Sequence, residues 1–120
     1  MKEVFADTAY WIALTNPTTD AVLVEYLNAL AEKGARVRRA AIETVEAILK
    51  NPSVRVLPQT RRSFTRGFTL YKGRPDKGYS LTDCLSMTVM REHRLSSVLT
   101  TDKHFEQEGF VPLMISKARP

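Results

Sequence analysis

The sequence predicts an α/β domain built around a mostly parallel sheet. Short apolar runs alternate along the chain with longer segments of helical periodicity, and this alternation is typical of a parallel sheet covered by helices. The 120 residues fit one domain, residues 1–120, and the 43% of hydrophobic residues is enough for one continuous core. No repeat or linker-like tract divides the chain.

The predicted strands are short apolar or alternating runs bounded by turn residues. The first ends in Asp7, and the second, which we expect to be very short, follows Gly34. In order along the chain, the predicted strands are residues 3–6, 35–38, 54–57, 96–100 and 110–113.

The predicted helices carry apolar residues three and four positions apart. The stretch 16–20 is rich in turn-forming residues, and we expect it to be a loop in which Asp20 caps the following helix. Gly34 is a natural end for that helix, and residues 72–78 are expected to form a basic loop. In order, the predicted helical segments are residues 8–14, 21–31, 40–49, 63–71 and 80–93.

Composition excludes several classes of protein. No apolar run approaches the roughly 20 residues that a membrane-spanning helix requires, and the N-terminus lacks the long apolar stretch of a secretory signal. We therefore expect a cytoplasmic protein without a membrane partner. The single cysteine, Cys84, excludes an internal disulfide and a cysteine-based zinc site. The net charge of +5 and the pI of about 9.6 favour a polyanionic partner such as nucleic acid.

Three aspartates are predicted to meet at one edge of the sheet. Asp7 ends the first strand and Asp102 follows the strand at 96–100, so both belong at the carboxyl edge, where parallel sheets bind ligands. Asp83 lies in the first turn of the helix that begins near Ser80. A crossover helix runs antiparallel to the strands it joins, so its N-terminus lies over the same edge. The topology therefore predicts that these carboxylates converge.

A fourth carboxylate is predicted to join them. Glu43 lies in the first turn of the helix that begins near Ala40, and Glu46 lies about one turn deeper. Carboxylates that share a crevice repel one another, and a divalent cation removes this penalty. Oxygen ligands favour Mg²⁺ or Mn²⁺ over zinc. An acidic metal site in a basic protein points to hydrolysis of phosphodiester bonds.

Each acid also has a purely structural interpretation. Residues 80–83 fit a capping box at the start of a helix, and Asp7 and Asp102 are also suited to helix capping. Their predicted convergence favours the functional interpretation. The histidines lack the spacing of metal ligands, and we expect His104 to be partly buried and hydrogen-bonded beside Phe105.

Two other fold families place acids at the carboxyl edge of a parallel sheet. A phospho-receiver domain needs an acidic pair near its first strand and a lysine after a late strand, whereas Asp7 stands alone and Thr101-Asp102 occupies the late position. A haloacid-dehalogenase-type phosphatase needs Asp-x-Asp after the first strand, and the sequence here is Asp7-Thr8-Ala9. The sequence fits neither pattern.

Four segments of the chain carry a recognisable set of motifs: residues 5–14 (FADTAYWIAL), 79–86 (YSLTDCLS), 100–105 (TTDKHF) and 109–110 (GF). These segments resemble the PIN-domain family and, within it, the VapC-type toxins of toxin–antitoxin pairs, and they follow the family's order over nearly the whole chain. The resemblance implies a PIN-like three-layer α/β/α fold and a metal-dependent endoribonuclease. It also implies a homodimer and a small antitoxin that holds the toxin inactive.

The resemblance assigns roles to individual residues. The family's acidic positions, which hold Mg²⁺ or Mn²⁺, map onto Asp7, Asp83 and Asp102. The supporting polar positions around the metal match Thr8, Ser86 and Thr101.

The family's remaining acid is a Glu on the helix after the second strand, usually preceded by a Thr-rich strand end. In one alignment this region is compressed and Glu43 takes the role, which its first-turn position favours. In the other, residues 38–56 match the family's next helix and strand, and roughly twenty residues that include the Glu are missing. The second alignment predicts a catalytically impaired module that binds RNA or an antitoxin without cutting.

The densest basic stretch lies just before Asp83. Each of its side chains taken alone fits a solvated surface, but together they are suited to binding RNA phosphates. These residues are Arg61, Arg62, Arg66, Lys72, Arg74 and Lys77.

Overall fold

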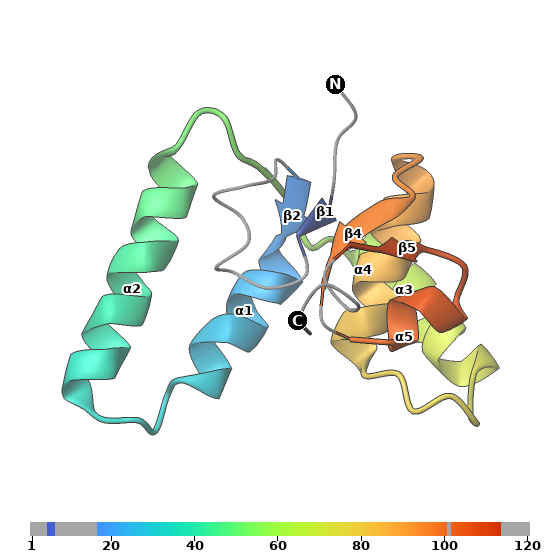
Figure 1. Ribbon diagram of the computed structural model, residues 1–120, viewed down its shortest axis with the longest axis horizontal. Helices are drawn as coiled ribbons and strands as arrows, with labels where there is room; N and C mark the ends of the chain where they lie inside the picture. Colours follow the sequence, from blue (N-terminus) through green and yellow to red (C-terminus); the bar gives the residue numbers. More distant parts are fainter. Residues whose placement is uncertain (1–4, 7–16, 101, 114–120) are drawn as a thin grey trace.

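The computed structural model of the chain describes residues 5–6, 17–100 and 102–113 (Figure 1). Within them, parallel strands lie between two groups of helices. One side carries α1 (Asp20–Ala29) and α2 (Ala35–Lys50), and the other carries α3 (Arg61–Gly73), α4 (Leu81–Glu92) and α5 (His104–Gln107). The predicted three-layer α/β/α architecture is therefore confirmed. No helix in these ranges is long and apolar enough to cross a membrane.

The strands form two parallel groups. Strand β4 (Ser97–Leu99) pairs with β1 (Phe5–Ala6) on one side and with β5 (Val111–Pro112) on the other. Strand β2 (Pro17–Thr19) pairs with β3 (Arg55–Leu57). Because every pairing among the described strands is parallel, paired strands end at the same edge. The paired positions include Phe5 with Val98, Ser97 with Val111, and Thr18 with Val56.

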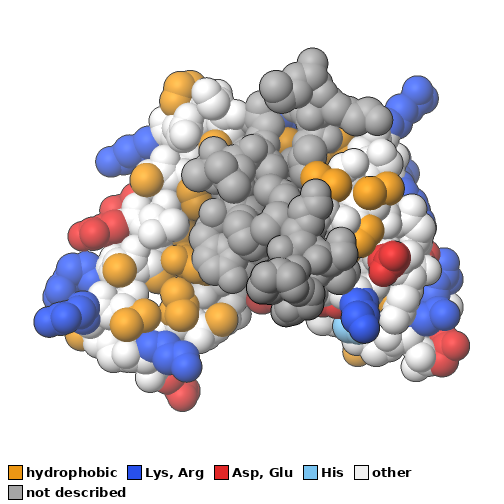
Figure 2. Space-filling view, viewed as in Figure 1, with side chains coloured by type: hydrophobic (Ala, Val, Ile, Leu, Met, Phe, Trp, Pro, Cys, Tyr) orange, Lys and Arg blue, Asp and Glu red, His pale blue; other side chains and the backbone are white. Residues whose placement is uncertain are grey.

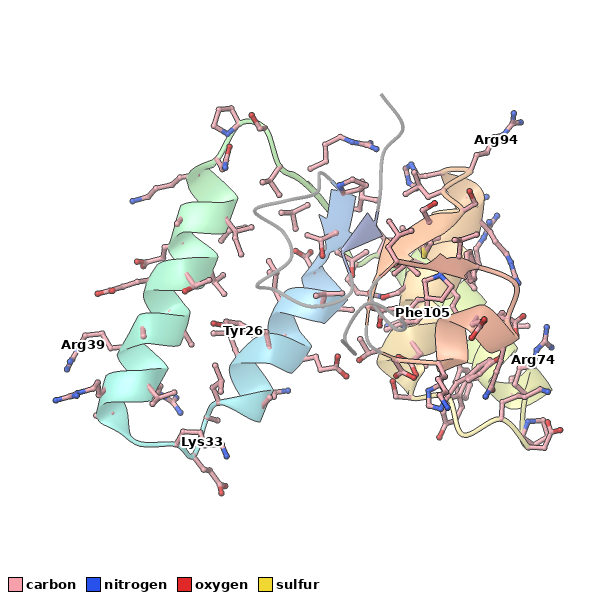
Figure 3. The ribbon with its side chains drawn as sticks, viewed as in Figure 1. Tyr26, Lys33, Arg39, Arg74, Arg94 and Phe105 are labelled. Atoms are coloured by element: carbon pink, nitrogen blue, oxygen red, sulfur yellow. The ribbon has the colours of Figure 1, made fainter. Side chains whose placement is uncertain are left out.

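Helix α4 lies at the centre of the main core. Most of its side chains between Asp83 and Met90 are buried, and Cys84 and Met87 have no exposed surface. They pack in one cluster with Phe105 of α5 and with apolar side chains of β4 and the segment before β5 (Figure 3). A helix that is buried on most sides has little freedom to shift, so its N-terminus is held in place.

A smaller apolar cluster joins α1 to α2. Leu23 of α1 packs against Val45 and Ile48 of α2, and Tyr26 covers this contact from α1 (Figure 3). On the face of this pair that Figure 2 shows, apolar side chains lie among blue and red charged groups. Helix α2 is thus anchored mainly through α1.

Strand β2 replaces the loop expected at its position. Its backbone pairs with β3, and Pro17, which has no N–H to donate, stands at the first position of the strand. The following helix is capped by Thr19, whose hydroxyl oxygen accepts the Val22 N–H at 3.3 Å, and the prediction that Asp20 is the cap is wrong. The Asp20 carboxylate instead accepts the Gln59 N–H at 3.1 Å.

Residues 35–38 begin α2 instead of forming the expected strand. Gly34 has a φ of 99°, a conformation that favours glycine, and its carbonyl accepts the Arg38 N–H at 3.0 Å. Gly34 therefore precedes α2 rather than ending α1, which ends at Ala29. The Arg38 guanidinium also donates to the Ala31 carbonyl at 3.0 Å, which ties the first turn of α2 to the preceding turn.

The other predicted elements within the described ranges agree with the structure to within a few residues. The predicted helical turns at residues 8–14 lie outside these ranges, as does the first half of the predicted first strand.

Helices α3 and α4 approach each other closely at Gly67. A Cβ atom built at this position would contact the Leu85 side chain and lie 3.0 Å from the Leu85 Cα. A Cβ atom built at Gly73, at the end of α3, would meet open space. The absence of a side chain at Gly67 therefore allows these two helices to pack.

We predict that Gly67→Ala lowers the free energy of unfolding by about 1–3 kcal/mol, because overpacking against Leu85 outweighs the gain in helix propensity. Thermal unfolding followed by circular dichroism measures the change. Gly73→Ala is the matched control, and we expect it to leave the stability unchanged or slightly raised. A Gly67→Ala variant as stable as the control would contradict the close approach of the helices.

Candidate active site

The N-terminus of α4 carries Asp83, which is buried. The Ser80 hydroxyl oxygen accepts the Asp83 N–H at 3.0 Å, and Asp83 Oδ2 accepts the Ser80 N–H at 3.1 Å. The predicted capping box is therefore confirmed. These reciprocal bonds fix the direction of the Asp83 carboxylate at the end of a helix that the core already holds.

Asp102 lies between β4 and α5. Its N–H donates to Thr100 Oγ1 at 3.0 Å, and its Oδ1 accepts the His104 N–H at 2.9 Å. The carboxylate therefore holds the start of α5, although Lys103 occupies the capping position itself. Asp102, like Asp83, is fixed by bonds to the backbone beside it.

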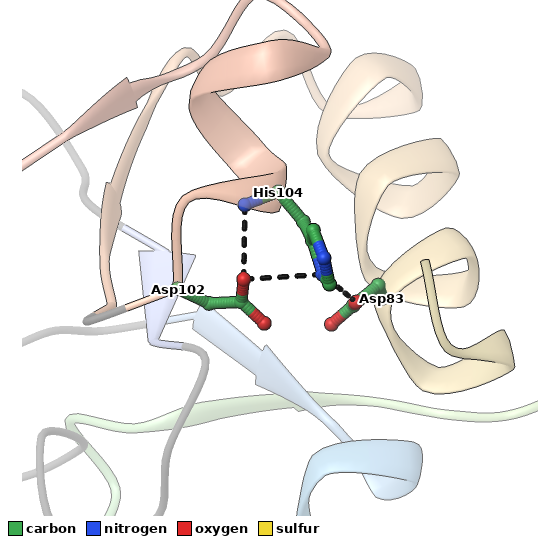
Figure 4. Close-up of side chains that lie close together, drawn as sticks. All are labelled: Asp83, Asp102 and His104. Atoms are coloured by element: carbon green, nitrogen blue, oxygen red, sulfur yellow. Dashed lines mark hydrogen bonds and ion pairs between the residues drawn. The ribbon is translucent and has the colours of Figure 1, made fainter. Parts of the chain in front are cut away.

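Figure 4 shows that Asp83, Asp102 and His104 lie together. His104 Nδ1 is 3.0 Å from Asp83 Oδ2 and 3.1 Å from Asp102 Oδ1. One ligand atom from each of the three residues lies within 4.8 Å of the other two. His104 is partly buried and hydrogen-bonded, as expected. The start of α5 turns its ring toward both aspartates, so an imidazole nitrogen lies among the atoms that could hold an ion.

Glu25 of α1 belongs to the same acidic region. Burial of its carboxyl group raises the pKa of Glu25, the negative charges of Asp83 and Asp102 raise it further, and a hydrogen bond with Thr82 opposes them. Much of the side chain is nevertheless exposed, so its carboxyl group lies at the rim of the cluster. Glu25 is therefore near enough to feel both aspartates, although it is not among the residues whose ligand atoms lie within 4.8 Å of one another.

The sequence carried a signal for Glu25 that the expected loop concealed. Strand β2 contains Thr18 and Thr19, and Glu25 lies on the helix that follows. A Thr-rich strand end followed by a Glu-bearing helix is the arrangement described above for the family's remaining acid. Glu25 therefore matches that position better than Glu43 does.

Glu43 does not reach the acidic cluster. Helix α2 begins at Ala35, so Glu43 lies in its third turn and the first-turn prediction is wrong. Glu43 and Glu46 are both exposed, and α2 packs against α1 on the opposite side of the strands from α4 and α5 (Figure 1). In the first turn of α2, apolar residues alternate with arginines, a pattern typical of a short strand, and this is why the predicted helix starts too late.

Ser86 lies one turn after Asp83, on the same face of α4. It is fully buried, and its Oγ has no hydrogen-bond partner within the described part of the chain. An unpaired buried hydroxyl costs about 1–3 kcal/mol, so a group at the site that can pair with it would offset this cost.

Asp7, Thr8 and Thr101 lie outside the described ranges, and their roles at the metal stay predictions.

The donor set fits a hard divalent cation. Among the described residues, the bonds of Asp83 use Oδ2 and those of Asp102 use Oδ1, which leaves one oxygen of each for an ion. Glu25 offers a third carboxylate, and His104 adds an imidazole nitrogen. Carboxylate oxygens suit Mg²⁺ or Mn²⁺, and either ion would offset the repulsion among these acids.

Glu108 ties the loop beside the site to the core. Arg74 donates to its Oε1 and Oε2 at 3.0 and 2.7 Å, the Tyr79 hydroxyl to Oε1 at 2.9 Å, and Arg91 to Oε2 at 3.0 Å. The bonds from Arg74, with those from Tyr79 and Arg91, outweigh burial and lower the pKa of Glu108 to about 2. The Tyr79 ring centroid lies 5.3 Å from that of His104, so this network reaches the acidic cluster.

Comparison with known proteins agrees with this geometry. The family model of the PIN domain matches residues 4–110. The chain belongs to the PIN-domain family. Among solved structures, this PIN domain is similar to VapC20 of Mycobacterium tuberculosis, a sarcin-ricin loop cleaving toxin, with a TM-score of 0.77 and 24% identity over 92% of this chain and 98% of that chain. No curated protein sequence matches it significantly.

Some of the basic residues predicted to bind RNA already form ion pairs with acids of this PIN domain. Glu92 pairs with Arg66 at 2.7 Å and with Arg62 at 3.7 Å. Glu108 pairs with Arg74 at 2.7 Å. These ion pairs offset part of the positive charge of the predicted RNA-binding stretch, so its residues are expected to contribute unequally to RNA binding.

We predict that Glu108→Gln lowers the stability at neutral pH by about 1–3 kcal/mol, because its neutral amide cannot form charge-assisted bonds with Arg74 and Arg91. The folded-state pKa of about 2 lies below the ordinary value of 4.5. The carboxylate's contribution is therefore complete above that ordinary value and disappears as the pH falls through the folded-state pKa. Urea unfolding of both proteins over this pH range measures the effect. A wild-type advantage that does not shrink on acidification would contradict the assignment.

Proposed function

We propose that this PIN domain is a metal-dependent endoribonuclease that hydrolyses RNA phosphodiester bonds. The observation that carries the proposal is the approach of Asp83 and Asp102 from different elements, with Glu25 close enough to respond to both charges. Helix capping alone explains each aspartate but does not require acids from separate elements to meet. The similarity to VapC20, which cleaves the sarcin-ricin loop, supports RNA as the substrate.

The proposed cofactor is Mg²⁺ or Mn²⁺. We expect Asp83, Asp102 and Glu25 to hold it, with Asp7 as the further ligand that the sequence predicts. When bound, such a cation lowers the pKa of bound water and stabilises the charge that develops during phosphodiester cleavage. The supporting polar residues proposed around it are Thr8, Ser86 and Thr101.

The chain's own residues orient these groups before substrate arrives. Ser80 holds Asp83, the backbone N–H of His104 holds Asp102, and the His104 ring lies against both carboxylates. Acids with fixed directions need little reorganisation when they act on a substrate. The net charge of +5 attracts a polyanionic strand toward this acidic edge.

We further propose that the protein is the toxin of a toxin–antitoxin pair. Its partners would then be the RNA substrate, a small antitoxin protein that blocks the acidic cluster, and a second copy of the chain in a homodimer. The protein would act in the cytoplasm. The resemblance of its motifs to VapC-type toxins and the similarity in fold to VapC20 support this proposal.

We predict that Asp102→Asn and Glu25→Gln each lower metal-dependent RNA cleavage by about 100-fold or more. Glu43→Gln is the matched control for Glu25→Gln, because it removes the same charge from the neighbouring helix, and it should cleave like the wild type. Electrophoresis of a panel of RNAs incubated with Mn²⁺ or with EDTA measures cleavage. Equal activity of the two glutamine variants would contradict the role of Glu25.

Calorimetric titration with Mn²⁺ separates the nuclease from a catalytically impaired module. The same substitutions, Asp102→Asn and Glu25→Gln, should weaken Mn²⁺ binding by about 10-fold or more, and Glu43→Gln should not. A folded wild type that binds RNA but neither binds Mn²⁺ nor cuts any tested RNA would favour the module that binds without cutting.

We predict that Lys72→Gln combined with Lys77→Gln weakens RNA binding and reduces the salt dependence of the affinity. The slope of log affinity against log salt should fall in magnitude by about 0.7 for each phosphate that the variant no longer neutralises. Arg66→Gln should have less effect, because Glu92 already offsets the Arg66 charge. Fluorescence anisotropy at several salt concentrations in EDTA measures the slope. An unchanged slope in the double variant would count against phosphate binding by this stretch.

A further inference from the structure

A cavity of about 320 Å³ opens at the end of α3, beside the acidic cluster. Phe68, Tyr71 and Lys72 of α3 line one part of it, and Gly78 and Tyr79, which precede α4, line another. Its volume is near the lower end of the roughly 300–1,000 Å³ that is typical of small-ligand sites. The cavity therefore suits one small, partly apolar group.

Two aromatic rings of this cavity face solvent. Phe68 is 41% exposed and Tyr71 is 45% exposed, and they lie three positions apart on α3. Lys72 Nζ lies 4.9 Å from the centroid of the Phe68 ring, and Phe64 stacks on Phe68 at 5.9 Å between centroids. Exposed rings beside a cation form a surface on which a nucleobase stacks while its phosphate meets the positive charge.

The cavity and the acidic cluster share a wall. Tyr79 lines the cavity, and its ring also lies against that of His104, which contacts both aspartates. A Cβ atom built at Gly78 would lie 3.9 Å from His104 Nε2. Because the Tyr79 hydroxyl is bonded to Glu108, this wall is held in place without a ligand. A group bound in the cavity would therefore lie next to the acidic cluster.

We propose that this cavity is a subsite for an unpaired nucleobase of the RNA, adjacent to the bond that is cut. The inference rests on the proposed nuclease function and assigns a place to one base of its RNA substrate. That base must be unpaired, because a base paired within a helix cannot enter a cavity. The net charge of +5, with Lys72 at the cavity, favours a polyanion over an antitoxin peptide as its occupant.

Binding of single-stranded RNA in EDTA tests the subsite separately from cleavage. The probes are short RNAs, varied in sequence, that carry one 2-aminopurine, whose fluorescence falls when it stacks. We expect the wild type to quench single-stranded probes, and Phe68→Leu and Tyr71→Leu each to weaken their binding by about 10-fold and reduce the quenching. Phe68→Tyr and Tyr71→Phe keep a ring and should bind like the wild type.

Leu49→Ala on α2 controls for the removal of exposed apolar surface, since Leu49 is 59% exposed and lies away from the cavity, and it should not change binding. Leucine variants that melt like the wild type and bind single-stranded RNA equally well would overturn the subsite. Absence of quenching by the wild type with every probe, or an equal weakening of duplex binding in the leucine variants, would also overturn it.

Different experimental results would contradict the subsite and the proposed nuclease function. A wild type that cuts no RNA with Mn²⁺, but whose RNA binding depends on the rings of Phe68 and Tyr71, would overturn the nuclease and support the subsite. Metal-dependent cleavage with an unchanged KM in both leucine variants would support the nuclease and overturn the subsite.

Discussion

The buried N-terminus of α4 is the constraint on which the candidate site depends. Because α4 is surrounded by the main core, its first turn cannot move without disturbing the apolar packing around it. Asp83 meets two needs there, since Oδ2 completes the capping box with Ser80 while the carboxylate also faces Asp102 and His104. A carboxylate has two oxygens, so capping leaves one for an ion. The structural and the functional interpretation of Asp83 are therefore compatible.

Parallel pairing explains how residues distant in the sequence meet at this helix end. Strand β4 pairs with both β1 and β5, so the segments that follow paired strands leave from one edge, and Asp102 follows β4 there. The chain then turns into α5, which brings His104 to Asp83 at the start of α4 and is followed by Glu108. Glu108 binds Arg74, which precedes α4, and Arg91, near its end. One buried carboxylate thus fastens the loop that forms the wall of both the acidic cluster and the aromatic cavity.

The local sequence pattern was sufficient to predict a helix or strand wherever the element's own residues determine its structure. The apolar periodicity of α4 and the apolar run of β4 predicted both elements, and with them the positions of two aspartates. Strand β2 could not be predicted in this way, because Pro17–Thr19 is a strand only through its pairing with β3, which is distant in the sequence. Missing β2 concealed Glu25, and the late start assigned to α2 made Glu43 the apparent substitute. The place of His104 depends on the turn into α5, which residue spacing does not encode.

The acids of the acidic cluster differ from other acids of the chain in the charged groups that surround them. Glu92 and Glu108 are paired with Arg66 and Arg74, and such pairing stabilises a carboxylate within the chain itself. At the site, by contrast, Asp83 and Asp102 share one contact with His104, and the raised pKa of Glu25 reflects both its burial and the negative charges of the two aspartates. A chain with a net charge of +5 has ample cations for internal pairing. The negative charge of the acids at this edge is therefore suited to neutralisation by a group from outside the chain. A divalent cation would supply the positive charge at a single point.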